Sequence, residues 1–356
     1  MKERTKEVLR DGFGCLVNNS AAIRGAKAGP LWLTIVMFVL SIFLPIIPLF
    51  VAQLNTNGST FLRSYSYGLE RYVTQIALDL RDNRLARFSI DENHLLSITE
   101  ANTEQNIDFS EYDSNKPYAS YIDKTTNQYN FLVYISDATT DKTKNATNAV
   151  IAATAYSLNS TTVSEETENI YHPSYMILFK NGVYVVIYTP NGTKAITSSY
   201  SGDFKSLNPG NDYLDQLLTV TKKDKDGEKT IAPSMIDDEY VNGVYKNFKK
   251  FLDKSYETLK VKNTLVSSAI YLGVFFGLSV LMGFLMWILT RGKHNPNNYY
   301  TPWLTMKVQA RLGLSPALIT LILGFFLTTY APMIYILTIG LRVMWISMKE
   351  LRPIQQ

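Results

Sequence analysis

Long apolar runs divide the chain at unequal intervals. They cover residues 31–53, 264–290 and 314–348, and the stretch 54–262 between the first two is polar. A membrane-spanning helix needs about 20 consecutive apolar residues. The sequence therefore predicts an integral membrane α-helical protein with one large water-exposed insert.

The distribution of charge predicts how the chain is threaded. Residues 54–262 hold 22 Lys and Arg against 27 Asp and Glu, whereas the rest of the chain holds 13 against 4. Basic flanks stay on the cytoplasmic side of a membrane. We expect a bacterial plasma-membrane protein with residues 1–30 cytoplasmic and 54–262 extracellular. The overall net charge of +4 hides this division, so it does not indicate a nucleic-acid partner.

The first and last apolar runs each contain proline. The run 31–53 is too long for a cleaved signal peptide and predicts a retained span, bent near its outer end by Pro45 and Pro48. Pro332 divides the last run into two short spans, 314–330 and 333–348. Such a hairpin returns the tail 349–356 to the cytoplasm, as its basic residues require.

Three groups of residues within or near the spans are candidate sites. Ala269, Gly273 and Gly277 lie four apart on one face of the second span, 264–290, where they let another helix approach closely. That helix is either a partner's or one of the chain's own spans. Arg342 lies near the inner end of the fourth span, where its side chain either reaches the lipid headgroups or pairs with a partner.

The third group lies in the predicted cytoplasmic linker, 291–313. Thr301 is a suitable N-cap and Pro302 a suitable first residue for a short helix. Its residues Trp303, Lys307 and Arg311 predict a helix that lies in the membrane interface or serves as a docking element.

The insert 54–262 predicts an α+β domain with a mainly antiparallel sheet. Apolar residues recur at helical spacing over 61–82 and 237–262, and these two helices are expected to pair as a stalk. Between them, Asn181-Gly182 predicts a hairpin with a type I′ turn. The remaining predicted strands are 175–180, 183–189, 193–200, 131–136, 150–158, 217–222 and 228–232, with 137–149 as a loop and turns at 190–192 and 224–227.

Residues suited to catalysis are sparse. His94, His172 and His294 are far apart in the sequence, and Cys15 is the only cysteine. The Asp224–Gly227 segment lacks the later Glu of a calcium loop, and no nucleotide-binding or nucleophile motif occurs. We therefore expect neither an enzyme, a cofactor nor a metal site. Tyr171, Tyr175, Tyr184 and Tyr188 predict cross-strand packing, with stacking on a carbohydrate as the alternative.

A family resemblance adds to this interpretation. Residues Asn298 through Lys307 and Arg311 through Pro316 resemble a Firmicute membrane protein family, the MalA family, which is named for maltodextrin utilisation and has no assigned biochemistry. The layout of one span, an external domain and three spans is similar too. The resemblance implies an accessory or regulatory protein of a carbohydrate ABC transporter, with a sugar ABC permease as partner.

Two other functions remain open at this point. One is an extracellular ligand sensor, although no signalling enzyme follows the spans. The other is a membrane enzyme or transporter, although the spans contain almost no acidic or polar residues for a substrate path.

Overall fold

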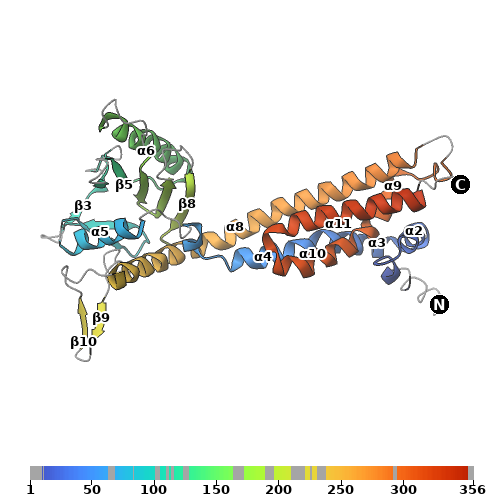
Figure 1. Ribbon diagram of the computed structural model, residues 1–356, viewed down its shortest axis with the longest axis horizontal. Helices are drawn as coiled ribbons and strands as arrows, with labels where there is room; N and C mark the ends of the chain where they lie inside the picture. The colour runs from blue at the N-terminus through green and yellow to red at the C-terminus, as the bar shows by residue number, and fades with distance from the viewer. Residues whose placement is uncertain are drawn as a thin grey trace. The chain divides into compact units, whose positions relative to one another are not determined.

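The chain folds as two units, each with a core of its own (Figure 1). A helical unit comprises Met1–Asn55 with Val261–Gln356, and an α+β unit comprises Thr56–Lys260, close to the predicted insert 54–262. The structure is a computed structural model. It describes residues 10, 12–62, 69–82, 84–100, 105–109, 112–113, 116–122, 128–162, 172–188, 196–209, 221–224, 227–230, 238–291 and 295–351.

The first apolar run is helical but interrupted. After α2 (Asn19–Ala28), helix α3 (Leu31–Phe43) passes through a 3₁₀ turn (Leu44–Ile46) into α4 (Ile47–Leu54). Pro45 and Pro48 have no backbone N–H, so each removes one hydrogen bond of a continuous α-helix. The interruption falls where the two prolines predict it.

Four helical segments of the described chain are long and apolar enough to span a membrane: Leu31–Leu54, Val241–Leu289, Pro302–Phe326 and Thr328–Leu351. The second lies in α8 (Asp238–Leu289), one continuous helix that covers 238–262 of the predicted segment 237–262 and 264–289 of the predicted segment 264–290. The third joins α9 (Pro302–Leu312) and α10 (Leu314–Phe326), and the fourth contains a 3₁₀ turn (Thr328–Tyr330), α11 (Ala331–Ile346) and a π turn (Ser347–Leu351).

Helices α10 and α11 form an antiparallel hairpin. At its closed end a Cβ on Gly324 would lie 3.3 Å from the Cβ of Ala331. At its open end Arg342 donates a hydrogen bond to the Leu312 carbonyl, just before α10 begins. The two helices that Pro332 predicts are therefore present, and Pro332 itself occupies the first turn of α11, where no N–H is needed.

The α+β unit is built on a five-stranded sheet with the order β4-β5-β6-β7-β8. Its strands are β4 (Ala119–Ile122), β5 (Tyr129–Ser136), β6 (Ser174–Phe179), β7 (Gly182–Tyr188) and β8 (Ile196–Asp203). Strands β5 and β6 are parallel and the other neighbours antiparallel, so the sheet is mainly antiparallel as expected.

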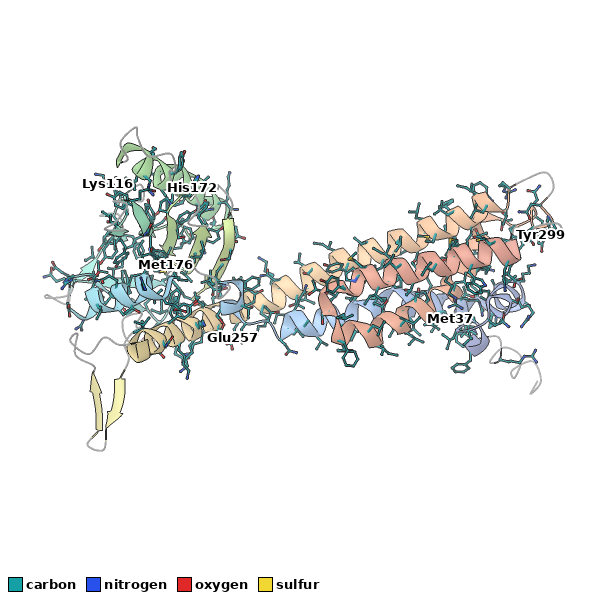
Figure 2. The ribbon with its side chains drawn as sticks, viewed as in Figure 1. Met37, Lys116, His172, Met176, Glu257 and Tyr299 are labelled. Carbon is teal, nitrogen blue, oxygen red and sulfur yellow. The ribbon has the colours of Figure 1, made fainter. Side chains whose placement is uncertain are left out.

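Helices cover both faces of this sheet. One face packs Leu132, Tyr134 and Ile177 against Ile151 and Ala155 of α6 (Asp141–Thr162). The other face packs Val133, Met176 and Val185 against α5 (Leu69–Arg81) and the first part of α8; Figure 2 labels Met176. Because both faces are covered, the central strands β5, β6 and β7 are almost wholly buried.

Helix α6 corrects two expectations. Residues 137–149 were expected to be a loop and 150–158 a strand, but Asp141–Thr162 is helical. The adjacent β-branched residues Val150 and Ile151 suggested a strand. Ile151 and Ala155 instead face the sheet at helical spacing, and the helix begins with reciprocal hydrogen bonds between the backbone and hydroxyls of Thr140 and Thr143.

The hairpin between β6 and β7 forms, but its turn differs from the prediction. Phe179 pairs with Gly182, so Lys180 and Asn181 are the two turn residues. Neither Asn181 nor Gly182 has a positive φ, so the turn is not type I′. The Asn181 Nδ2 donates a 2.9 Å hydrogen bond to the Thr139 carbonyl.

Two smaller sheets complete the α+β unit. One has the order β1-β2-β3, from β1 (Arg87–Ile90), β2 (Leu96–Thr99) and β3 (Asn106–Ile107); the other pairs β9 (Thr221–Asp224) with β10 (Gly227–Thr230). The second is the hairpin predicted around 224–227. Residues 225–226, the turn 190–192, Tyr171, His294 and residues 63–68 of the predicted helix 61–82 lie outside the described residues.

Candidate functional site

The small-residue face of α8 points away from the helical unit. Ala269, Gly273 and Gly277 are exposed, and a Cβ added to either glycine would meet no other atom within 4 Å. By contrast, a Cβ on Gly283 would overlap the sulfur of Met306 in α9. Close helix packing inside the unit therefore uses Gly283. The alternative that the predicted face packs against the chain's own spans is wrong.

Helix α9 packs inside the helical unit and continues into α10 as one candidate span, whereas the sequence predicts a separate helix in the linker 291–313. It packs against α2 and α3, and its side chains Val308 and Leu312 belong to a core with Met37 of α3, which Figure 2 labels. The third candidate span therefore starts at Pro302, where Thr301 caps the helix as predicted.

The three predicted residues of α9 divide between two environments. Trp303 is exposed, and the Lys307 Nζ lies 5.6 Å from the centre of its ring. Arg311 is only 1% exposed, and its Nε and Nη2 donate hydrogen bonds of 3.2 and 3.0 Å to Thr34 Oγ1. A Cβ on Gly25 or Gly29 would overlap the guanidinium, so glycine at both positions makes room for it.

Arg342 is half-buried and bonded to the main chain. Its Nη1 donates a 2.9 Å hydrogen bond to the Leu312 carbonyl, and its Nη2 donates to the Cys15 carbonyl. The Leu312 carbonyl would ordinarily accept from residue 316, but Pro316 has no N–H. Arg342 therefore supplies the missing donor, a contact within the helical unit that the sequence does not predict. Its contact with lipid headgroups or with a partner stays a prediction.

A groove of about 890 Å³ opens beside Arg342, between the start of α2, α10 and α11. We refer to it as the basic groove. Its polar lining includes Asn18, Asn19, Arg342, Lys349 and Glu350, and its apolar lining includes Leu16, Ile319, Leu341 and Trp345. The sequence predicts Arg342 as a candidate site but gives no sign of this groove, because its walls come from both ends of the chain.

Buried polar side chains inside the helical unit were also missed. Gln309, Ser279 and Thr320 are each at most 1% exposed. Ser279 and Thr320 lie in predicted spans, whereas Gln309 lies in the predicted linker 291–313. The amide of Gln309 and the hydroxyl of Thr320 have no hydrogen-bond partner among the described residues. Apart from the first part of α8, the four candidate spans contain no Asp or Glu before Glu350.

A lysine and two tyrosines interact at the end of α2. The Lys27 Nζ donates a 2.6 Å hydrogen bond to Tyr299 OH, and it lies 4.9 Å from the ring centre of Tyr300. The hydrogen bond raises the pKa of Lys27 and lowers that of Tyr299. Because Tyr300 is buried in the core, the interaction fixes the segment before α9 onto α2.

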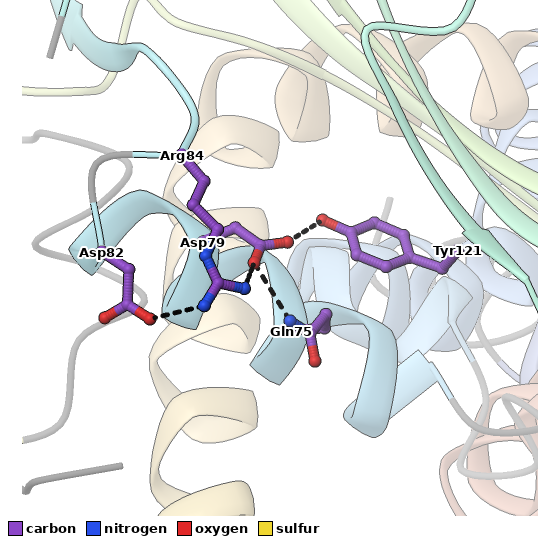
Figure 3. Close-up of polar contacts among 5 residues, drawn as sticks. All are labelled: Gln75, Asp79, Asp82, Arg84 and Tyr121. Carbon is purple, nitrogen blue, oxygen red and sulfur yellow. Dashed lines mark hydrogen bonds and ion pairs between the residues drawn. The ribbon is translucent and has the colours of Figure 1, made fainter.

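Asp79 of α5 lies at the centre of a cluster of polar contacts in the α+β unit (Figure 3). It accepts hydrogen bonds from Gln75 Nε2 at 3.0 Å and Tyr121 OH at 3.2 Å, and its Oδ1 lies 3.3 Å from Arg84 Nη1. Burial and the charge of Asp79 raise the pKa of Tyr121. The cluster joins α5 to β4, and Arg84 lies between its two carboxylates, 3.3 Å from Asp79 Oδ1 and 3.3 Å from Asp82 Oδ2.

The aromatic residues of β6 and β7 are buried under α6 rather than exposed to a ligand. Tyr175 and Tyr188 belong to the core on that face of the sheet, and Tyr184 packs against it. His172 stacks between Tyr156 and Tyr188. These tyrosines pack across strands, as predicted, and do not form an exposed platform for a carbohydrate. Within the described residues, no cluster of His, Cys, Asp and Glu could hold a metal ion.

Comparison of the chain with models of known protein families, with curated proteins and with solved structures found no match. The resemblance noted in the sequence therefore stays a prediction.

Proposed function

We propose that this chain is an accessory membrane protein that binds another integral membrane protein through the outer face of α8. The observation that carries the proposal is the open space around Gly273 and Gly277. Helices in lipid associate through close backbone contact at small residues. A face of Ala269, Gly273 and Gly277 that no described residue of its own unit covers is suited to such a contact.

The chemistry of this face favours a membrane helix as the partner. The exposed neighbours of the small residues are apolar and include Ile270, Val274 and Leu281. The family resemblance further suggests the permease of a carbohydrate ABC transporter of the maltodextrin type. In this proposal the protein lies in a bacterial plasma membrane with Thr56–Lys260 outside, where that unit is available to a carbohydrate or to the transporter's other components.

One observation favours the second candidate, an extracellular ligand sensor. Helix α8 contributes Val244 and Phe248 to the core of the α+β unit, and Phe275 and Met286 to the cores of the helical unit. Helix α8 is thus one continuous helix that contributes side chains to the cores of both units. Because the sensor would still need a signalling partner, the two candidates share the partner-binding step.

The experiment compares three glycine-to-leucine variants of the full chain, purified from its host membranes with a mild detergent. Gly277→Leu should leave the fold intact, because the added side chain meets open space, but remove the partner protein. Overpacking a close contact costs about 1–3 kcal/mol, which is roughly a five- to hundredfold loss of affinity.

Two variants serve as controls. A Cβ on Gly340 of α11 also meets nothing within 4 Å, so Gly340→Leu should keep both fold and partner. Gly283→Leu should destabilise the fold because of Met306. Quantitative mass spectrometry of the co-purified membrane proteins, with melting curves of each variant, provides the readout. If Gly277→Leu retains the same membrane proteins as Gly340→Leu, the face of α8 contacts lipid and the proposal is wrong.

A further inference from the structure

The wall of the basic groove along α11 combines polar and apolar side chains. Thr338, Arg342 and Trp345 follow one another in α11 at intervals of three or four residues and therefore share one face of that helix. Lys349 also lines the groove and lies in the π turn that follows α11. The two cations, Arg342 and Lys349, thus occur in a groove whose apolar lining includes Leu341 and Ile319.

The charge of Arg342 is not neutralised by the described residues around it. Its three acceptors are the carbonyls of Leu312 and Cys15 and the side-chain oxygen of Asn19, all of them neutral. A guanidinium has five N–H groups, so two remain available to a ligand. Among the described residues that line the groove, Glu350 is the only acid, and its Oε1 accepts a 2.9 Å hydrogen bond from Ser20 Oγ.

The second cation of the groove is held near its position by an aromatic ring. The Lys349 Nζ lies 5.3 Å from the ring centre of Trp345, and Trp345 is 60% exposed. Leu341 is also exposed, although it belongs to a candidate span. The groove thus combines two cations with an apolar wall that has no protein cover among the described residues.

We propose that the basic groove binds an anionic glycerophospholipid of the phosphatidylglycerol type. The phosphate lies between Arg342 and Lys349, and an acyl chain follows Leu341 and Ile319. A lining with two cations and one acid favours a headgroup with net negative charge over a zwitterionic one. Arg342 also holds the Leu312 carbonyl, so the lipid binds where α2, α10 and α11 meet. This site is separate from the α8 face and does not depend on it.

The test measures lipid selectivity of the purified full chain by native mass spectrometry, with equal amounts of phosphatidylglycerol and phosphatidylcholine in the detergent. The wild type should retain phosphatidylglycerol preferentially. Lys349→Gln should lower the ratio of the two bound lipids about fivefold, which corresponds to about 1 kcal/mol. Glu350→Gln removes the only acid among the described lining residues and should raise the ratio by a similar factor.

Lys307→Gln is the matched control, because Lys307 stands over Trp303 in the same four-residue spacing as Lys349 over Trp345 but outside the groove. It should leave the ratio unchanged. A competition measurement adds inorganic phosphate at millimolar concentration. The phosphate should not displace the lipid, because it has no acyl chain to contact the apolar lining of the groove.

Four results would overturn the proposal: equal retention of both lipids by the wild type, an equal loss with Lys307→Gln, no rise with Glu350→Gln, or displacement by inorganic phosphate. The opposite signs expected for the two groove variants keep the test valid if one of them fails to fold.

Discussion

The hydrogen bond from Arg342 to the Leu312 carbonyl can be tested by restoring the donor that Pro316 removes. In the wild type, Arg342→Met leaves the Leu312 and Cys15 carbonyls without the donor that the structure gives them. Hydrogen bonds to a charged group contribute about 1.5–3 kcal/mol each. Removing the guanidinium also removes the free-energy cost of burying its charge, which offsets part of this destabilisation. We expect Arg342→Met to destabilise the helical unit by about 2–4 kcal/mol.

The same change should cost less in a Pro316→Ala background. Alanine at position 316 has a backbone N–H that can donate to the Leu312 carbonyl, as in an ordinary α-helix. We therefore expect a coupling of about 1–2 kcal/mol between the two substitutions, well above the 0.3–0.5 kcal/mol scatter of independent sites. At about 2–4 °C per kcal/mol, the double variant should melt several degrees above the additive expectation.

The chain contains its own reporter for this measurement. Cys15 is the only cysteine and is 0% exposed, and burial raises the pKa of its thiol, so a thiol-reactive fluorophore labels it only when the helical unit opens. Pro332→Ala is the matched control, because Pro332 lies in the first turn of α11, where its missing N–H leaves no carbonyl without a donor. The coupling energy of Arg342→Met with Pro316→Ala is compared with its coupling energy with Pro332→Ala. If the two coupling energies are equal, the assignment of Arg342 to the Leu312 carbonyl is refuted.

Four further predictions concern the α+β unit and the threading. Residues 56–262 expressed alone should fold without metal or oxidant; a circular dichroism spectrum of a disordered chain would contradict this. Burial raises the pKa of Tyr118 and Tyr134 from 10 to about 12, so the folded unit holds these protons more tightly than the unfolded chain. The contribution of these two tyrosines to stability in urea should therefore be constant below pH 10 and fall by up to about 2–3 kcal/mol per tyrosine between pH 10 and 12. Asn159→Ala should cost about 2 kcal/mol, because the amide bonds both the N–H and the carbonyl of Tyr129, whereas Ser160→Ala should change stability by less than about 0.5 kcal/mol. In whole cells, an impermeant maleimide should label a cysteine at Ser160 but not one at Gln355; labelling of both would exclude the hairpin topology in the membrane.

The elements that could be predicted from the sequence are those with a local cause. Pro45 and Pro48 predicted the interruption of the first helix, and Pro332 predicted the two helices of the last apolar run. Both predictions are possible because the missing N–H of proline affects the helix at the position of the proline itself. The strands β5, β6 and β7 could be predicted from short, strongly apolar segments beside a turn. For α6, two local signals disagreed. The β-branched pair Val150-Ile151 favours a strand, whereas the hydrogen bonds between Thr140 and Thr143 are typical of the start of a helix.

The position of α9 could not be predicted, because its cause is not local. Lys307 and Arg311 make the segment look like a surface helix, and a buried arginine is acceptable only where polar partners and space exist. Thr34 supplies the acceptor for Arg311, while Gly25 and Gly29 supply the space. These residues lie far from Arg311 in the sequence, so their contribution is visible only after folding.

The same reasoning limits what the family resemblance can imply. The residues that carry it include Thr301, which caps α9, Arg311, which is buried, and Pro316, which leaves the Leu312 carbonyl to Arg342. Side chains that hold a bundle together constrain its fold, and one fold can serve many functions. A shared inward-facing segment is thus an argument for a shared helical architecture. The choice of partner depends instead on outward surfaces, which here are the Gly273–Gly277 face of α8 and the basic groove. The face of α8 lies outside both segments that carry the resemblance, whereas Ser315 and Pro316 of the second segment also line the basic groove.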